Sequence, residues 1–158
     1  MRNTPTISGA QFSQATVSTF AATNGQALVT TRMASDTDGD CYLWYAYDGW
    51  NAIRLYRADD TGTIAFTQLG ANFTPTAVAG DILRLESDGS THTCKKNGVS
   101  QGTRTDATYA TGQPGLAVGW AVAETDSEMD DWSGGDLAGG AVAKAHPALM
   151  AGPAAWCP

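Results

Sequence analysis

The stretch GDILRLESDGSTHTCKKNG, residues 80–98, decides the fold. Residues 82–86 alternate apolar and charged side chains, which is the period of a β-strand with one buried face. Asp88-Gly89 and Asn97-Gly98 are dipeptides typical of tight turns between antiparallel strands. The stretch therefore predicts a strand, a turn, a second strand and a second turn.

Short β-rich runs separated by turn residues occur along most of the chain. Residues 41–47, CYLWYAY, have the strongest strand character, and Asp48-Gly49 turns them back into the next run. No segment shows a sustained helical period with capping residues, so no long helix is expected. This pattern predicts an all-β protein, a two-sheet antiparallel β-sandwich. Besides the second strand of residues 80–98, the expected strands are 11–20, 26–33, 41–47, 52–57, 63–69, 82–86, 99–103 and 115–123, and residues 129–132 lead into a final short strand.

The composition divides the chain into three parts. Residues 1–10 are a polar N-terminal arm, residues 11–137 are the sandwich domain, and residues 138–158 are a tail rich in Ala, Gly and Pro. We expect the tail to dock, either on its own sandwich or on a neighbouring subunit. The side chains expected to anchor it are Leu149, Met150 and Trp156.

The bulk properties exclude several classes of partner. The chain has 158 residues, enough for one domain with its own core, and a formal net charge of −7. An acidic surface argues against a nucleic-acid partner and against docking on an anionic membrane. No apolar run is long enough to span a membrane, so no membrane insertion is expected. The N-terminus lacks the apolar core of a signal peptide, which predicts cytoplasmic synthesis, with a virion or particle surface as one destination.

The cysteines indicate a reduced protein. Cys41, Cys94 and Cys157 are an odd number, so reduced thiols are expected rather than a disulfide framework. His92 and Cys94 lie in the opening stretch, and we interpret both as buried packing residues.

Three groups of residues, in this order, carry a resemblance to a known family: Gly80-Asp81-x-Leu83-x-Leu85 with Asn97-Gly98-Val99, Gly112-x-Pro114-Gly115, and Asp130-Asp131-Trp132 with Gly135-Asp136-Leu137. Over residues 11–137 the chain resembles the concanavalin A-like lectin/glucanase jelly rolls, in particular the laminin-G-like modules. The resemblance implies two curved antiparallel sheets, with glycan or protein ligands on the concave face or the loop rim. Modules of this family carry further strands before the one that starts near Gln11 here. The resemblance therefore implies an open sheet edge at this strand, which the arm, the tail or a neighbour must cover.

Aromatic residues are concentrated in one predicted hairpin: Tyr42, Trp44, Tyr45, Tyr47, Trp50 and Tyr56. Because side chains alternate along a strand, some of these rings belong to the core and others to the surface. Exposed aromatic rings stack on sugars or form protein interfaces. The residues expected to contact a ligand are Tyr47, Asp48 and Trp50, next to the hairpin turn.

Two acidic clusters have spacings compatible with a functional site, one for calcium binding and one for glycoside hydrolysis. Asp36, Asp38 and Asp40 offer oxygen ligands for calcium, the one cofactor considered, although their order is not that of an EF-hand and a plain acidic turn is the alternative. Glu124, Asp126 and Glu128 have the spacing that places three carboxylates on one face of a strand in the glucanases of the resembled superfamily. Thr125 and Ser127 between them favour a solvated acidic loop instead.

Three functional hypotheses follow. The leading one is a non-enzymatic structural or recognition subunit of a larger assembly, such as a virion decoration, coat or adhesion protein. Such a subunit would contact neighbouring subunits in a homo-oligomer or particle shell through its arm and tail. The first alternative is a lectin-like module that binds glycan around residues 36–40 and Trp50. The second is a glycoside hydrolase that uses Glu124 and Glu128.

Overall fold

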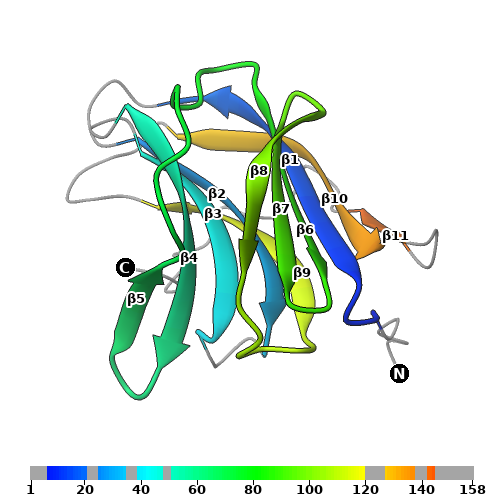
Figure 1. Ribbon diagram of the computed structural model, residues 1–158. Helices are drawn as coiled ribbons and strands as arrows, with labels where there is room; N and C mark the ends of the chain where they lie inside the picture. Colours follow the sequence, from blue (N-terminus) through cyan, green and yellow to red (C-terminus); the bar gives the residue numbers. More distant parts are fainter. Residues whose placement is uncertain are drawn as a thin grey trace.

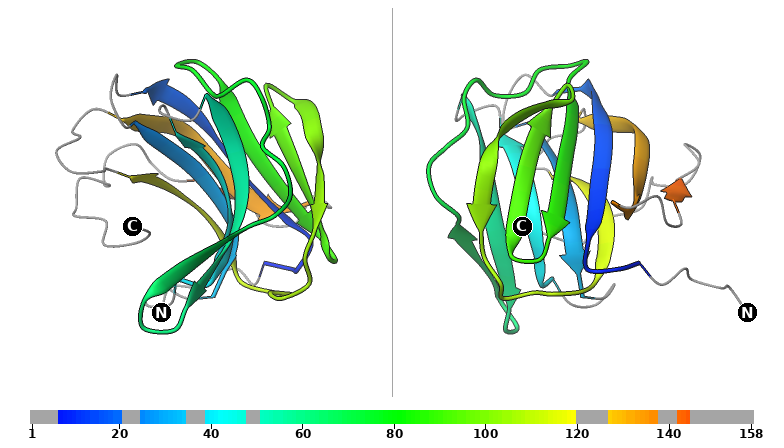
Figure 2. Two further views of the ribbon diagram at one scale, coloured as in Figure 1. Left: turned by 60° about the vertical axis from the view of Figure 1, so that its left-hand side comes forward. Right: turned by 45° about the vertical axis from the view of Figure 1, so that its right-hand side comes forward.

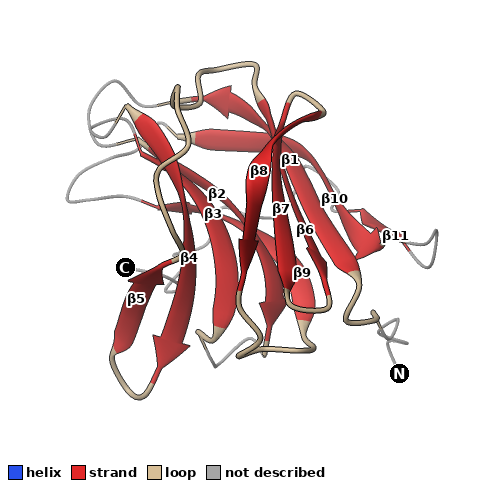
Figure 3. Ribbon diagram, in the orientation of Figure 1, coloured by secondary structure: helices blue, strands red, loops and turns tan. Residues whose placement is uncertain are grey.

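The fold is built from β-strands alone. The computed structural model describes residues 7–20, 25–34, 39–47, 51–119, 127–137 and 142–144, and this part of the chain contains eleven strands and no helix (Figure 3). Accordingly, no helix there is long and apolar enough to cross a membrane. The strands are β1 (Gln11–Thr19), β2 (Gln26–Met33), β3 (Cys41–Tyr47), β4 (Ala52–Asp60), β5 (Ile64–Gln68), β6 (Ile82–Asp88), β7 (Thr91–Lys96), β8 (Val99–Thr105), β9 (Gln113–Gly119), β10 (Glu128–Asp136) and β11 (Val142–Lys144).

The strands form two sheets that pack face to face (Figure 1). The six-stranded sheet has the order β11-β10-β1-β6-β7-β8, and the five-stranded sheet has the order β5-β4-β3-β2-β9. Every pair of neighbouring strands is antiparallel. The predicted two-sheet antiparallel sandwich is therefore confirmed.

The stretch 80–98 forms the predicted hairpin. β6 and β7 pair from Asp88↔Thr91 to Leu83↔Lys96, with the first turn between them. Asn97 and Gly98 in the second turn both have positive φ, 53° and 77°, which is the geometry that an Asn-Gly hairpin turn supplies. The local turn chemistry thus sets the register of three consecutive strands, β6, β7 and β8.

The open edge expected at the strand near Gln11 does not exist. β1 lies inside its sheet, between β10 and β6, and β10 in turn pairs with β11 from the C-terminal segment. The tail thus supplies the end strand of this sheet, as one of the three covers that were expected. The strand beside β1 is β10, which is nine residues long, whereas the sequence indicated only a short strand near residues 129–132. Its glycines weaken the strand signal, yet they are needed here: a Cβ on Gly134 would lie 2.9 Å from Pro114 Cβ.

The core lies between the sheets and follows the alternation of side chains. In β3, Tyr42, Trp44 and Ala46 face inward and are fully buried. From the other sheet, Leu83 and Leu85 of β6 join the same cluster. Burying each leucine contributes roughly 1.5–3 kcal/mol to folding. The register of the 80–98 hairpin therefore also places Leu83, Leu85 and Cys94 in this core.

A chain of polar groups crosses the core and links the sheets. Thr31 Oγ1 of β2 lies 2.7 Å from Ser87 Oγ of β6, which lies 2.8 Å from His92 Nδ1 of β7. His92 Nε2 lies 3.1 Å from the carbonyl oxygen of Asp106. Because a carbonyl only accepts, Nε2 carries the hydrogen and Nδ1 accepts from the Ser87 hydroxyl. Burial lowers the pKa of His92, and both this ring and Cys94 are fully buried, which confirms their interpretation as packing residues.

Candidate functional site

The outer faces of the two sheets have different chemistry. The outer face of the six-stranded sheet carries ion pairs: Glu86 Oε1 lies 2.6 Å from Arg84 Nε and 2.8 Å from Lys95 Nζ. The Arg84 guanidinium also covers the ring of Phe12, 3.9 Å from its centroid. Such charged, mutually paired side chains are typical of a solvated surface.

The outer face of the five-stranded sheet is apolar and aromatic. Figure 2 shows this sheet curved, with the edge strands β5 and β9 turned away from the other sheet, so that the outer face is concave. Leu28, Cys41, Leu43 and Ala58 are buried on this face and form a second apolar cluster, separate from the core between the sheets. The partly buried side chains that pack against this cluster are Met33, Tyr45, Tyr56, Ile64 and Ala117.

Four rings form a continuous row across this face, which we call the aromatic row. Neighbouring ring centroids are 6.5 Å apart for Tyr47 and Tyr45, 6.2 Å for Tyr45 and Tyr56, and 6.0 Å for Tyr56 and Phe66. The row therefore runs from β3 across β4 to β5. Phe66 is 39% exposed, and Arg54 Nη1 donates a 3.1 Å hydrogen bond to the Tyr56 hydroxyl within the same face.

The sequence places these rings by strand alternation. Since Tyr42 and Trp44 fill the core, Tyr45 and Tyr47, displaced by an odd number of residues, face outward. Tyr56 lies diagonally across from Tyr45, whose direct partner is Arg54. Diagonal neighbours are within reach of aromatic side chains, which is why the rings touch across strands.

The β9 side of the same face has small residues at positions 115 and 117. Ala117 lies opposite Leu28 and Gly115 lies opposite Thr30. A Cβ on Gly115 would lie 2.8 Å from Thr30 Oγ1, so a larger residue there would require the Thr30 side chain to move. The face therefore has small residues on β9 and the aromatic row on β3, β4 and β5.

The sequence-predicted ligand residues meet this face only in part. Tyr47 is a member of the aromatic row. Asp48 and Trp50 lie outside the described residues. Phe66 was missed because TIAFTQL gives a single ring on an ordinary edge strand, and only the pairing of β4 with β5 brings it beside Tyr56.

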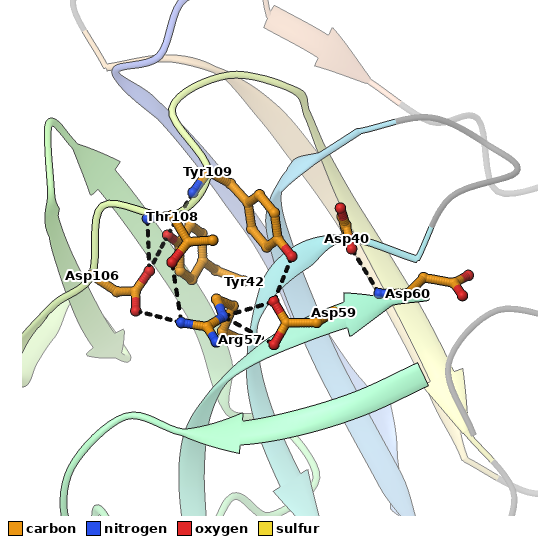
Figure 4. Close-up of polar contacts among 8 residues, drawn as sticks. All are labelled: Asp40, Tyr42, Arg57, Asp59, Asp60, Asp106, Thr108 and Tyr109. Atoms are coloured by element: carbon orange, nitrogen blue, oxygen red, sulfur yellow. Dashed lines mark hydrogen bonds and ion pairs between the residues drawn. The ribbon is translucent and has the colours of Figure 1, made fainter. Parts of the chain in front are cut away.

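An acidic corner closes one end of the sandwich (Figure 4). Arg57 Nε lies 2.8 Å from Asp59 Oδ1, and Arg57 Nη1 lies 2.9 Å from Asp106 Oδ2. Tyr109 donates a 2.6 Å hydrogen bond to Asp59 Oδ1, and Tyr42 donates one of 2.6 Å to Asp106 Oδ1. These contacts tie the end of β4 to the loop between β8 and β9.

The pKa shifts in this corner follow from these contacts. Burial opposes ionisation of Asp106, but hydrogen bonds from Tyr42, Thr108 and Arg57 outweigh it and lower the pKa of Asp106 to about 2. Burial and the hydrogen bond to Asp106 raise the pKa of Tyr42 to about 12. Both groups therefore keep one protonation state near neutral pH, as expected of structural groups rather than of an acid–base pair.

Of the three predicted calcium ligands, only Asp40 lies within the described residues. Asp40 Oδ1 accepts a 2.7 Å hydrogen bond from the backbone N–H of Asp60. Asp36 and Asp38 lie outside the described residues. Among the residues that are described, no group of three acidic, His or Cys side chains could hold a metal ion.

Of the other candidate residues from the sequence, the three acidic residues and the three tail anchors, only Glu128 lies within the described residues. Glu128 is exposed at the start of β10, where its Oε2 lies 3.5 Å from Thr19 Oγ1. Its predicted partners Glu124 and Asp126 lie outside the described residues. The three tail anchors are also outside them: Leu149, Met150 and Trp156.

Comparison with known proteins shows the fold. No protein-family model and no curated protein matches the chain. A solved carbohydrate-binding module, CBM66 from Bacillus subtilis, matches with a TM-score of 0.66 and 17% identity, covering 82% of this chain and 77% of that one. The Caenorhabditis elegans galectin LEC-6 matches with a TM-score of 0.54 and 12% identity, over 80% and 86% of the two chains. Sheep galectin-11, solved in complex with glycerol, matches with a TM-score of 0.56 and 10% identity, over 82% and 92%.

Proposed function

We propose that this chain is a non-enzymatic carbohydrate-binding module that holds a saccharide on the concave outer face of its five-stranded sheet. The observation that carries the proposal is the aromatic row, Tyr47, Tyr45, Tyr56 and Phe66, on the outer face opposite the one that carries the ion pairs of Glu86. A structural sandwich has no need to place a chain of large rings on one outer face and paired charges on the other.

The chemistry of the row suits a sugar. The C–H face of a sugar ring packs on an aromatic ring, and a tyrosine adds a hydroxyl at the edge of the same contact. The Arg54 guanidinium and the Tyr56 hydroxyl lie 3.1 Å apart on this face and supply polar groups for sugar hydroxyls. Because the row crosses three strands, we propose an oligosaccharide laid across β3, β4 and β5 as the ligand.

The fold relatives support this function over the assembly hypothesis. A carbohydrate-binding module and two galectins share the sandwich, and none of these three is a coat or decoration protein by its name. The assembly hypothesis depends on the tail anchors, which lie outside the described residues, so contacts with neighbouring subunits stay a prediction.

A glycan array with the full chain tests the proposal directly. We expect binding to a defined set of oligosaccharides, and binding that weakens in Phe66→Ala. The matched control is Val99→Ala, because Val99 is also an exposed apolar residue but lies on β8 of the other sheet. Absence of binding to any glycan, or equal loss in both variants, would refute the proposal.

Catalysis is tested in the same preparation. We expect no change in the length of a bound oligosaccharide after prolonged incubation. Release of shortened products that stops in Glu128→Gln would instead favour the glycoside hydrolase hypothesis.

A further inference from the structure

A second site lies at one end of the sandwich, away from the aromatic row. A pocket of about 280 Å³ opens there between the start of β1, the β6–β7 turn and the loop between β8 and β9. Its walls are residues 9–10, residues 89–90, Ala107 and Ala110, together with Arg32. Apart from Arg32, every wall residue is glycine, alanine or serine, so the arginine is the one large and charged side chain there.

The backbone holds Arg32 in a fixed and unusual conformation. Its φ of 57° is in the left-handed region, which is uncommon for a residue other than glycine. Its backbone N–H donates a 3.0 Å hydrogen bond to Gln11 Oε1, and Gln11 Nε2 donates one of 3.0 Å to the carbonyl of Gly112. The chain packs so tightly that a Cβ on Gly112 would lie 2.4 Å from the Arg32 carbonyl carbon.

The guanidinium of Arg32 is buried without a counter-charge. Arg32 is 1% exposed, and its donors contact only carbonyl oxygens: Nε and Nη2 lie 3.2 Å and 2.8 Å from Gly9, and Nη1 lies 2.7 Å from Tyr109. Among the described residues no carboxylate forms an ion pair with it, and Asp88 acts on it only through space.

An arginine stays charged in proteins, and a buried charge is costly unless an opposite charge meets it. The three carbonyl contacts use three of the five N–H groups and leave one on Nη1 and one on Nη2. The side chain at the wall of the pocket therefore has a charge without a carboxylate partner and two N–H groups without a hydrogen bond among the described residues.

We propose that this pocket binds a small carboxylate, which pairs with Arg32. One carboxylate carries the single negative charge that the single guanidinium lacks, and its two oxygens match two N–H donors. A phosphate dianion would leave an excess negative charge beside Asp88 in a chain whose formal net charge is −7. The pocket goes beyond the proposed saccharide site because it shares no residue with the aromatic row.

An NMR titration of the full chain with sodium acetate tests the proposal, with sodium chloride holding the ionic strength constant. We expect saturable shifts of the backbone amides of Gly89, Ser90, Ala107 and Ala110, and no saturable shift with chloride alone. Shifts that grow linearly, or that chloride reproduces, would overturn the site. Tighter binding of inorganic phosphate than of acetate would overturn the assignment of ligand class.

Variants separate the pocket from general effects on the fold. Ala110→Leu narrows the pocket at an exposed wall position and leaves Arg32 itself unsubstituted. We expect this variant to bind acetate at least about tenfold more weakly. Ala79→Leu is the control, because Ala79 is exposed in the loop before β6 at the opposite end of the sandwich. Unchanged acetate binding in Ala110→Leu would contradict the proposal.

A second pair of variants addresses the charge. We expect Arg32→Lys to retain weakened binding and Arg32→Met to lose it, each compared at a temperature where the variant is folded. Equal binding by both would overturn the role of the guanidinium. Phe66→Ala is expected to leave acetate binding unchanged, so failure of the saccharide proposal and failure of this one are distinguishable.

Discussion

The phenol of Tyr42 donates a 2.6 Å hydrogen bond to Asp106 and accepts one of 3.0 Å from the backbone N–H of Tyr109. One buried hydroxyl thereby fastens the loop after β8 to the middle of the five-stranded sheet. The same loop supplies Tyr109 and Ala110, which lie beside Arg32 at the end of the sandwich.

Removing this hydroxyl is expected to destabilise the fold. Tyr42→Phe removes one of the hydrogen bonds to Asp106, which keeps those from Arg57 and Thr108, and leaves the Tyr109 N–H without this acceptor. We expect a loss of about 1–3 kcal/mol in the free energy of unfolding. Urea denaturation measures the loss. The half-buried Tyr109→Phe, which removes the contact with Asp59, should cost less. Equal stability of Tyr42→Phe and the native chain would show that the hydrogen bonds contribute nothing.

His92 is expected to make the fold sensitive to mild acid. Burial lowers its pKa from the ordinary value of 6.5, so between the two pKa values the unfolded chain binds more protons than the folded one. Stability is therefore complete above about pH 6.5 and falls below it, by at most about 1.4 kcal/mol per pH unit.

Urea midpoints between about pH 7.5 and about pH 5 measure this slope, which His92→Gln should flatten. Asp106 does not interfere, because its pKa is lowered to about 2 and its own contribution is lost only at more acidic pH. An unchanged slope in His92→Gln would assign the acid sensitivity to other groups.

The aromatic row is expected to act mainly through its rings. Tyr56→Phe keeps the ring and loses the hydroxyl that accepts from Arg54, so we expect a loss of saccharide affinity below about threefold. Tyr56→Ala also loses the ring contacts with Tyr45 and Phe66 and should weaken binding about tenfold or more. Isothermal titration calorimetry with the best array ligand measures both. Similar losses in the two variants would show that the hydroxyl rather than the ring recognises the sugar.

Calcium is expected to leave the protein unchanged. Asp40 already accepts a hydrogen bond from Asp60 N–H, which favours a plain acidic turn over a calcium loop. A bound ion would raise the melting temperature with concentration, since it would stabilise only the folded chain. We therefore expect the same melting temperature in calcium and in EDTA. A calcium-dependent rise that disappears in Asp38→Asn but persists in Asp88→Asn would restore the metal site.

Alanine substitutions at two glycines with positive φ allow the stability cost of backbone strain to be compared with that of steric crowding. Gly62 has φ of 93° with open space around its Cβ position, so Gly62→Ala should cost about 1 kcal/mol through strain alone. Gly112 has φ of 135° and its Cβ would meet the Arg32 and Met33 backbone, so Gly112→Ala should cost at least about 3 kcal/mol. Thermal unfolding measures both. Equal losses of stability in the two variants would show that the backbone around Arg32 moves readily to accommodate the added methyl group.

Local sequence signals predict most of the fold. Asp88-Gly89 and Asn97-Gly98 determine the turns of their hairpins because turn chemistry acts within four residues. The alternation of residues 41–47 correctly indicates that the aromatic residues divide between core and surface, and it includes Tyr47 in the candidate ligand set.

Relationships across the chain are harder to predict. Phe66 joins the aromatic row only through the pairing of β4 with β5. Residues 128–136 form a long strand through their pairing with β1, and Gly134 in it lies beside Pro114. Arg32 looks like the polar end of a strand in QALVTTRM. Its burial depends on Gly9, Gln11 and Tyr109, which come from distant segments. No local sequence pattern predicts that these segments lie side by side.

The strand β11 also bears on how the protein behaves at high concentration. Residues 133–135 of β10 pair with the three residues 142–144, so the last strand of this sheet is very short. An edge of this length offers few free backbone groups to a strand of another molecule. The segment that completes the sheet thereby also covers residues 133–135 of β10, and a chain that ended at residue 137 would leave the backbone groups of these three residues open to a strand of another molecule.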